Sequence, residues 1–384
     1  MKVSIIVGGK FHAFNLAEEL EKRNHLSQLI TSYPIWKISK YYNIKKKKIV
    51  TIFIKEIIER IILKLNLNKY LRFIFFYTNL YFQYLSSNKV HCKSINIIVG
   101  WAGFSLKSFK KCENYKVIKI LERGSSHIRY QLNILLEEYK KFNLKIFYDH
   151  KLINKELEEY DLADYISVPS KFAENTFINE GFKKEKIITI PYGVDLKSFR
   201  PKQKTENIFR FIYVGALSIR KGVIYTLKAF EELNLREAEL ILVGNIDEEI
   251  STLIEKYKKN KNIKFIGHVK QNDLVRFYNM CDVFVISSIE DGFAMVILQA
   301  LACGLPVICT INSGGSELIV NGRNGYIVPI RDIEKLKFKM LDLYSNQKKL
   351  IKMKKLILLN RRKFSWNEYG NKIVKKYKII SKNF

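Results

Sequence analysis

The chain has 384 residues, of which 47% are hydrophobic, and a formal net charge of +30 at pH 7. This length predicts two globular domains, each large enough to bury its own core. No apolar run approaches the roughly 20 residues that a membrane-spanning helix needs, which argues against a helical integral membrane protein.

The charge and the cysteines narrow the choice of partner and compartment. A net charge of +30 indicates an anionic partner, such as a membrane surface, a nucleic acid or a phosphorylated substrate. A compositional origin stays equally open, because the chain is rich in Lys, Ile and Asn together. No nucleic-acid-binding motif accompanies the charge, so we expect no nucleic acid. The five cysteines (92, 112, 281, 303 and 309) lack metal-ligand spacing, which predicts reduced core residues in a cytoplasmic protein.

The first elements are a strand and a glycine-rich turn. Residues 3–7 form a short apolar run that predicts a strand rather than a signal peptide. Gly8, Gly9 and Lys10 follow, and a helix is predicted from Ala13. A glycine turn between strand and helix lets the backbone approach a ligand closely. The alternative is a tight turn without a ligand, since the dinucleotide-binding fingerprint is absent.

Residues 37–93 are strongly basic, with 13 Lys or Arg against 2 Asp or Glu, a net charge of +11. Apolar residues recur at helical spacing from Val50 to Leu65, and aromatic residues follow between Arg72 and Tyr84. A basic amphipathic helix with aromatic neighbours suits an anionic membrane surface, so residues 45–85 are the candidate contact. The alternative is that the apolar stripe is core and the lysines are a solvated face.

Two further strands are predicted at 95–99 and 116–121, each ending in a glycine-containing loop. Loops at the carboxyl ends of parallel strands hold the ligand in doubly wound sheets. His127, after the second strand, is therefore the best single candidate in the first half, although a lone histidine is more often structural. Arg123 could hold a substrate phosphate or form an ordinary surface ion pair.

The second half restarts the strand–helix alternation after a Pro- and Gly-containing segment at 191–195, which predicts a domain boundary. A strand is predicted at 209–215 and a helix at 223–233. The loop between them carries Arg220, Lys221 and Gly222. Cations at the start of a helix oppose its dipole by roughly tenths of a kcal/mol unless an anion binds there. The pair therefore favours a bound anion at this loop, and the alternative is two solvated cations at the start of a helix.

One stretch of the second half organises the whole prediction. The apolar runs 282–286 and 306–310 are typical of buried parallel strands, and a helix lies between them. That helix begins after residues 292–294, where free N–H groups and the helix dipole favour a phosphate or a sugar hydroxyl. Asp291 precedes this point, and Gln299 follows about two turns later.

These segments resemble the nucleotide-sugar site of the retaining glycosyltransferases of family 4, the group 1 family with the GT-B fold. That family has two glutamates separated by seven residues, and then Ala-x-Ala-x-Gly-x-Pro-Val. Residues 299–307 match the tail, while Asp291 and Gln299 replace the glutamates. Both replacements keep an oxygen acceptor at the same spacing. Glu290 competes with Asp291 for the first acidic role.

The resemblance implies a role for each candidate residue. Arg220 and Lys221 bind the donor diphosphate and stabilise the charge that develops on it. Asp291 and His127, the other two catalytic candidates, contact the donor sugar, and Gln299 holds the ribose. The remaining donor-binding candidates are Gly9, Gly215, His268, Val269, Gly292, Phe293, Ala294 and Met295. Arg123 and Lys10 are the acceptor-binding candidates.

The resemblance also implies the fold and the domains. We expect an α/β protein of the GT-B type, with two Rossmann-like doubly wound domains that face a central cleft. Residues 1–195 would bind the acceptor, and residues 206–364 would bind the nucleotide sugar. The terminal helix, 365–384, would pack back on the first domain.

The implied function is a retaining glycosyltransferase that moves a sugar from a nucleoside diphosphate sugar to an acceptor hydroxyl. The acceptor would be a glycan or a lipid-linked molecule in bacterial surface polysaccharide or glycolipid synthesis. No Asp-x-Asp motif occurs and two cations stand where a metal would, so we expect no metal and no other cofactor. The expected location is cytoplasmic, with the inner face of the plasma membrane as a peripheral attachment site.

Two alternatives belong to other functional classes. One is a nucleotide-sugar epimerase on the same fold, which would turn over the donor without an acceptor. The other is a non-catalytic binding protein in which Asp291 and Gln299 mark a decayed site. The intact Arg220-Lys221-Gly222 segment argues against decay, because these cations have little use without a diphosphate.

Overall fold

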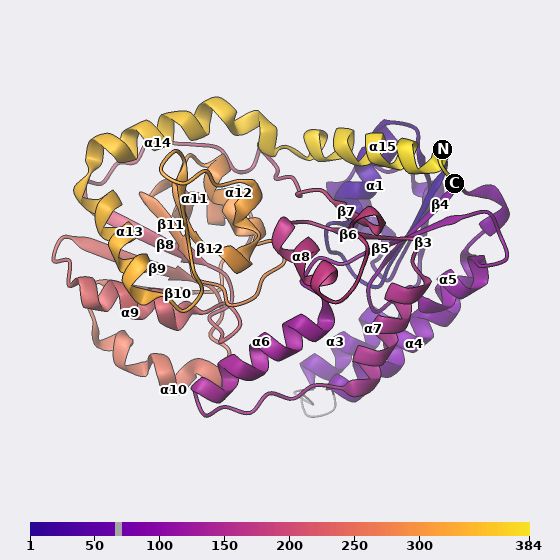
Figure 1. The fold of residues 1–384 in the computed structure, drawn as a ribbon, viewed down its shortest axis with the longest axis horizontal. Coiled ribbons are helices and arrows are strands. Elements are labelled where there is room, and N and C mark those ends of the chain that lie inside the picture. The colour runs from indigo at the N-terminus through magenta and orange to yellow at the C-terminus, as the bar shows by residue number, and fades with distance from the viewer. Residues whose placement is uncertain (66–70) are drawn as a thin grey trace.

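Two parallel β-sheets form the framework of the protein (Figure 1). The computed structural model describes residues 1–65 and 71–384. Within these residues the first sheet has seven strands in the order β3-β2-β1-β4-β5-β6-β7, and the second has six in the order β10-β9-β8-β11-β12-β13. The predicted α/β class with two Rossmann-like doubly wound halves is confirmed.

The first sheet and its helices come from the first half of the chain. The strands are β1 (Val3–Val7), β2 (Leu26–Thr31), β3 (Ile49–Thr51), β4 (Ile97–Trp101), β5 (Ile118–Glu122), β6 (Tyr165–Val168) and β7 (Ile187–Thr189). The helices are α1 (Ala13–Lys22), α2 (Ile35–Tyr41), α3 (Ile54–Lys64), α4 (Leu71–Lys89), α5 (Leu106–Cys112), α6 (Ile128–Lys141), α7 (His150–Leu162) and α8 (Lys171–Asn179).

The second half supplies the other sheet. Its strands are β8 (Phe209–Val214), β9 (Ala238–Val243), β10 (Ile263–Gly267), β11 (Val283–Ile286), β12 (Val307–Thr310) and β13 (Gly325–Val328). The helices are α9 (Val223–Leu233), α10 (Ser251–Ile254), α11 (Leu274–Asn279), α12 (Met295–Ala302), α13 (Ile333–Ser345), α14 (Gln347–Asn360) and α15 (Trp366–Lys382).

The order of the strands determines where a ligand can bind. The central strands are mainly apolar and buried along their whole length, as in β1 and β8, because helices cover both faces of a parallel sheet. The order reverses between β1 and β4 in the first sheet and between β8 and β11 in the second. Ligands bind outside the carboxyl ends of the strands at such switch points. The loops that follow these strands carry most of the predicted site residues.

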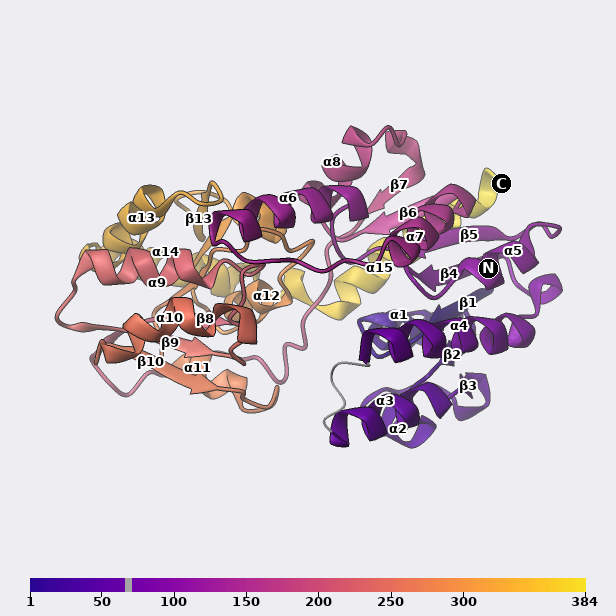
Figure 2. The same ribbon diagram turned by 90° about the horizontal axis from the view of Figure 1, so that it is seen from below.

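Helices α6 and α15 both connect the two halves. Helix α15 follows α14 on the second half and returns to lie along α1, which brings the two termini close together (Figure 1). At the end of α1, Arg23 Nη2 donates hydrogen bonds to Asn367 Oδ1 at 2.9 Å and Asn371 Oδ1 at 2.6 Å. Helix α6 belongs to the first half but lies against the second (Figures 1 and 2).

One local prediction is wrong in detail. The apolar stretch that begins at Val50 was predicted as a single helix, but residues 49–51 form β3, and α3 begins only at Ile54. The reason is strand pairing. β3 lies parallel to β2, with Val50 opposite Ile30, and forms an edge strand of the first sheet. Residues 66–70 of the predicted membrane-contact segment lie outside the described residues.

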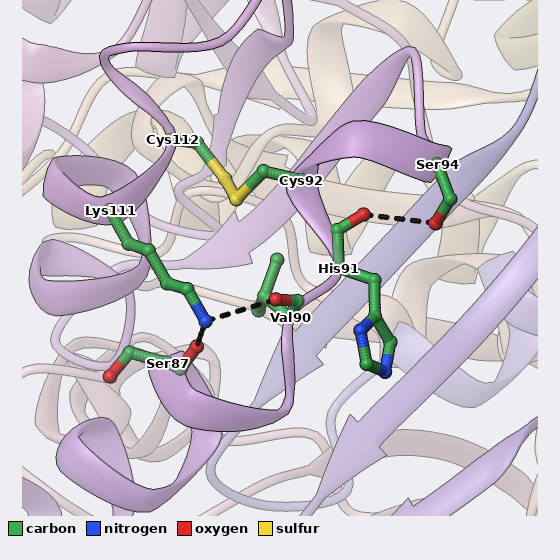
Figure 3. Close-up of a disulfide and its surroundings, with 7 residues drawn as sticks. All are labelled: Ser87, Val90, His91, Cys92, Ser94, Lys111 and Cys112. Carbon is green, nitrogen blue, oxygen red and sulfur yellow. Dashed lines mark hydrogen bonds between the residues drawn. A yellow bond between two sulfur atoms is a disulfide. The ribbon is translucent and has the colours of Figure 1, made fainter.

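The prediction of five reduced cysteines is wrong for one pair. Cys92 and Cys112 form a disulfide, with their Cα atoms 5.8 Å apart (Figure 3). Cys92 lies just before β4 and Cys112 ends α5, so a separation of 20 residues brings both into the same buried cluster. Beside the disulfide, Lys111 Nζ donates to the carbonyl oxygens of Ser87 and Val90 (Figure 3). Cys281, Cys303 and Cys309 are free and buried.

Candidate active site

Two loops meet at the carboxyl edge of the second sheet, and together they hold the strongest candidates. Residues 215–222 follow β8, and residues 287–294 follow β11. The loops are joined by a backbone hydrogen bond from Ile289 N to Arg220 O at 3.0 Å. Gly222 has a φ of +60°, and a Cβ there would lie 2.1 Å from the Ser287 carbonyl oxygen. Only glycine fits this close approach.

Lys221 forms an ion pair with Asp291 across these loops. Both side chains are largely buried, at 23% and 12% exposure. The backbone N–H of Asp291 donates to the Asn312 carbonyl oxygen at 2.8 Å, which fixes the position of the carboxylate. The structure thus brings together a cation and a carboxylate that are 70 residues apart in the chain.

Arg220 pairs with Glu290 rather than with Asp291. Its Nε donates to Glu290 Oε2 at 2.8 Å, while the side chain stays 37% exposed. Glu290 itself is fully buried. Burial alone would raise the pKa of this carboxyl, but the Arg220 charge and hydrogen bonds from Ser125 and other side chains outweigh it. The pKa is lowered to about 2, so Glu290 is charged at neutral pH.

The start of α12 is tightly enclosed. A Cβ on Gly292 would lie 2.4 Å from the Ser125 Cα, so only glycine fits between the two halves here. The Gly292 carbonyl oxygen accepts a hydrogen bond from Ser170 Oγ at 2.6 Å. The expectation of free N–H groups is wrong for Ala294, whose N–H donates to the Ser313 carbonyl oxygen at 2.9 Å. Phe293 is buried, and Met295 is the first residue of α12.

The other donor-side candidates lie around these loops. Gln299 is buried on α12, and its Oε1 accepts a hydrogen bond from the Tyr278 hydroxyl at 2.9 Å. Gly215 directly follows β8 with a φ of +148°. His268 is exposed and Val269 half-buried immediately after the edge strand β10. Gln299 therefore lies on α12, directly after the loop 287–294, whereas residues 268–269 follow the edge strand β10 of the same sheet.

The glycine turn of the first sheet lies at the corresponding edge of that half. The Gly9 carbonyl oxygen accepts a hydrogen bond from Thr31 Oγ1 at 3.2 Å, and the next residue, Lys10, is exposed. Arg123 is neither exposed nor free. Its guanidinium lies 2.9 Å from Glu156 and donates from Nη2 to Gln131 Oε1 at 3.0 Å. The ion-pair alternative thus describes this arginine, although the pair is largely buried.

The structure does not bring His127 together with the other catalytic candidates. Its side chain is 1% exposed and caps α6, where Nδ1 accepts a hydrogen bond from the Arg129 N–H. The ring lies 4.9 Å from the Phe177 ring and 5.0 Å from the Tyr160 ring. Burial, aided by the charges of Arg129 and Arg123, lowers the pKa of His127 to about 4. The ring therefore packs among aromatic side chains in this structure, and its contact with the donor sugar stays a prediction.

Sequence reasoning missed another histidine. His12 Nε2 lies 3.2 Å from Glu122 Oε2 at the carboxyl edge of the first sheet. The His12 ring packs 4.0 Å from the Tyr192 ring, and Tyr192 packs 5.3 Å from Phe293 of the second half. Two signals could have identified this cluster: a histidine three residues after the glycine pair, and a glutamate at the end of an apolar strand.

The residues that reach Glu290 from the first half were missed as well. They are Ser125 and Ser126 in the loop after β5, and Gln131 on α6. Nothing in the sequence separates these common polar residues from ordinary loop and helix surface. Their role follows only from contacts between the halves.

The basic stretch has an unusual surface. The isoleucine stripe of α3 faces solvent, with Ile57 46% and Ile61 50% exposed. Lys55 is instead buried and pairs with Glu59 at 2.8 Å. The alternative that the apolar stripe is core is therefore wrong for these residues. Among the described residues no helix is both long and apolar enough to cross a lipid bilayer.

Comparisons with known proteins point in one direction. The sequence profile of the family described as "Glycosyl transferases group 1" matches residues 195–357. An uncharacterized glycosyltransferase of Methanocaldococcus jannaschii is 28% identical over 303 residues, which cover 74% of this chain and 71% of the relative. A capsular polysaccharide biosynthesis glycosyltransferase of Staphylococcus aureus is 25% identical over 258 residues, covering 62% and 65%. The alignments with the second to fifth relatives span only 50 to 65% of those proteins.

Solved structures share the fold along the whole chain. A sucrose-phosphate synthase from Thermosynechococcus elongatus has a TM-score of 0.75, 17% identity and full coverage of both chains. The Anabaena protein HepE in complex with UDP has a TM-score of 0.70 and 13% identity over 98% of this chain and 100% of its own. Both therefore share the overall fold of this chain, the expected GT-B fold.

Proposed function

We propose that this chain is a glycosyl transferase of group 1 that transfers a sugar from a nucleoside diphosphate sugar to an acceptor hydroxyl with retention at the anomeric carbon. The observation that carries this proposal is the charge arrangement at the switch point of the second sheet. Arg220 and Lys221 lie on one loop, and each faces a carboxylate of the neighbouring loop.

The chemistry explains why these residue types are needed. The bond from the anomeric carbon to the diphosphate oxygen breaks, and negative charge develops on the leaving diphosphate. Fixed cations in a largely buried site stabilise that charge, with Arg220 as a planar fork and Lys221 as a point charge. The acceptor oxygen forms the new bond on the same face of the sugar, and its proton passes to the departing phosphate oxygen.

Asp291 is the better candidate for the donor sugar than Glu290. The Glu290 carboxylate is fully buried and already accepts hydrogen bonds at both oxygens. Asp291 retains slight exposure and a single cation, Lys221, that a diphosphate can recruit. Asp291 would then bind sugar hydroxyls once Lys221 has turned to the phosphate.

We propose that the reaction needs no metal, because the cations of one loop replace it. The Tyr278 hydroxyl holds Gln299 Oε1, which leaves the amide nitrogen of Gln299 to bond the ribose. UDP is the first nucleotide to test, since HepE is similar in fold and binds it. We assign the acceptor to residues 1–195 with helix 365–384, and the donor to residues 206–364.

The surface of α3 supports a membrane-associated acceptor. A row of exposed isoleucines, flanked by the exposed cations Arg60 and Lys64, matches an anionic lipid surface in both polarity and charge. We propose peripheral attachment at the inner face of the plasma membrane and a glycan or lipid-linked acceptor in surface polysaccharide or glycolipid synthesis. The similarity to a capsular polysaccharide biosynthesis glycosyltransferase favours that setting.

The test is donor turnover without acceptor, in EDTA, over a panel of UDP-, GDP- and ADP-sugars. A transferase slowly hydrolyses its donor, and proton NMR of the first free sugar should show the α-anomer from an α-linked donor. A new nucleotide sugar instead of free sugar would establish the epimerase alternative. A chain that neither binds nor turns over any member of the panel would contradict the proposal.

A further inference from the structure

Glu290 lies where the two halves of the protein touch. It directly precedes Asp291, and its carboxylate is fully buried. Its hydrogen-bond donors come from both halves of the chain. They are Ser125 Oγ at 2.7 Å, Ser126 Oγ at 2.7 Å, Ser126 N at 3.1 Å, Gln131 Nε2 at 2.8 Å and Arg220 Nε at 2.8 Å.

The two oxygens divide these donors unevenly. Among the described residues, Oε1 accepts from Ser125 and Ser126, in the loop after β5. Oε2 accepts from Gln131 of α6 and also from Arg220. Arg220 is therefore bound to the Glu290 carboxylate, and residues of the first half hold that carboxylate in place.

Arg220 also touches the first half directly. Its Nη2 donates to Ser125 Oγ at 3.1 Å, so the guanidinium is held at two points, one from each half. The side chain nevertheless stays 37% exposed. One side of the fork is anchored, and the rest of it can receive an oxyanion.

We propose that Glu290 is a positioning residue that orients Arg220 toward the leaving diphosphate only while the first half is docked on it. The inference rests on the proposed function, since it assigns Arg220 to the diphosphate. Docking of the loop 124–126 and of α6 fixes the carboxylate, and the carboxylate fixes the arginine. Stabilisation of the leaving group is thereby tied to closure of the two halves over the substrates.

A second buried carboxylate, Glu138, also bridges the two halves, and it serves as a comparison for Glu290. Glu138 lies on α6, as Gln131 does, and its side chain is fully buried between the two halves. It accepts from the Tyr225 hydroxyl at 2.5 Å and from Arg331 Nε at 2.6 Å. Its partners lie outside the loops of the site. Glu138 therefore has the same structural character as Glu290 without a connection to Arg220.

The experiment uses this matched pair in the full-length chain. Glu290→Gln and Glu138→Gln each remove one buried bridging charge, and Arg220→Ala supplies the background for a double-mutant cycle. The measurements are donor hydrolysis, resolved into kcat and KM, and calorimetric binding of UDP. Glu290→Gln should lower kcat roughly ten- to hundredfold and change KM less, while Glu138→Gln should stay within about threefold of the wild type.

The cycle separates positioning from general damage. In the Arg220→Ala background, Glu290→Gln should have almost no further effect on kcat, because it acts through the missing arginine. An equal loss in both backgrounds, or an equal loss from Glu138→Gln, would overturn the inference. If Glu290→Gln does not fold, Ser126→Ala should show the same split more weakly, and an unchanged kcat would overturn the inference. A wild type that turns over no sugar nucleotide would overturn the proposed function, and this inference with it.

Discussion

The loops of the second sheet and the helix α3 beside the first sheet use charge in opposite ways. In the loops, Arg220 and Lys221 each face a buried or nearly buried carboxylate. On α3, the lysine that is buried pairs within its own helix, and isoleucines occupy the exposed face. A site for one defined anion needs fixed cations with fixed partners, whereas a surface for lipid needs only exposed apolar area and nearby positive charge.

Asp291 offers the strongest test of the difference between the charged loops of the second sheet and helix α3. Asp291→Asn keeps the volume but removes the charge that faces Lys221 and would hold the donor sugar. We expect donor turnover to fall by roughly 10²- to 10³-fold with little change in the unfolding midpoint. Asp282→Asn is the control, because Asp282 is another buried aspartate of the same half, paired with Lys204 and Lys354. Equal losses of turnover in both variants would reduce Asp291 to a structural residue.

The second prediction concerns the exposed stripe. The double variant Ile57→Ser/Ile61→Ser should lower binding to phosphatidylglycerol vesicles by roughly a hundredfold, since insertion of each isoleucine contributes about 1.5 kcal/mol or more. Donor hydrolysis in solution should not change. Phe338→Ser, which alters an exposed apolar residue of the second half, serves as the control in the same flotation assay. If the wild type floats equally with neutral vesicles, charge contributes nothing; if it floats with neither, the surface is not a lipid contact.

The third prediction separates stability from donor binding. Cys112→Ser removes the disulfide to Cys92 and should lower the free energy of unfolding by about 3 kcal/mol, as expected for a loop closed over a separation of 20 residues. Nucleotide affinity should stay unchanged, because the disulfide lies in the first half. Alkylation of the unfolded, unreduced chain should label three of the five cysteines. Labelling of all five would show that the pair is reduced, as disulfides commonly are in the cytoplasm.

The smallest expected effect is the pH response of His127. Because its folded pKa is about 4 against 6.5 when unfolded, its contribution to stability is complete above pH 6.5. That contribution is lost as the pH falls from 6.5 toward 4. His127→Asn keeps an acceptor at the N-cap and cannot titrate, so its unfolding free energy should fall less between pH 6.5 and 5.5, by about 1 kcal/mol. Parallel curves for the two proteins would contradict the neutral, buried assignment.

The loop that carries Arg220 and Lys221 could be predicted from the sequence, whereas the exposed side of α3 could not. In the second half, the predicted helix 223–233 coincides with α9, and Arg220 and Lys221 lie on the expected loop. Apolar strands, a glycine and a local pair of cations encode that geometry within a few residues. The side on which a surface helix exposes its apolar stripe is not encoded locally, so the outward-facing stripe of α3 remained one of two alternatives.

Contacts over long sequence distances account for the features that local sequence patterns did not reveal. Glu290 meets Ser125 across 165 residues, and no local pattern distinguishes that serine from others. His127 was chosen because it follows a strand, yet the cap of α6 turns it inward among aromatic rings. Cys92 and Cys112 pair because two separate segments end at the same buried cluster.

The central claim is that Arg220 and Lys221 form a diphosphate site. The most direct measurement is calorimetric titration of UDP, GDP and ADP, in EDTA, into the wild type and into Arg220→Ala/Lys221→Ala. We predict tight binding of one nucleotide by the wild type and a loss of at least about a hundredfold in the double variant, because two charge-assisted contacts disappear. Binding that persists undiminished in the variant, or a wild type that binds none of the three, would contradict the claim.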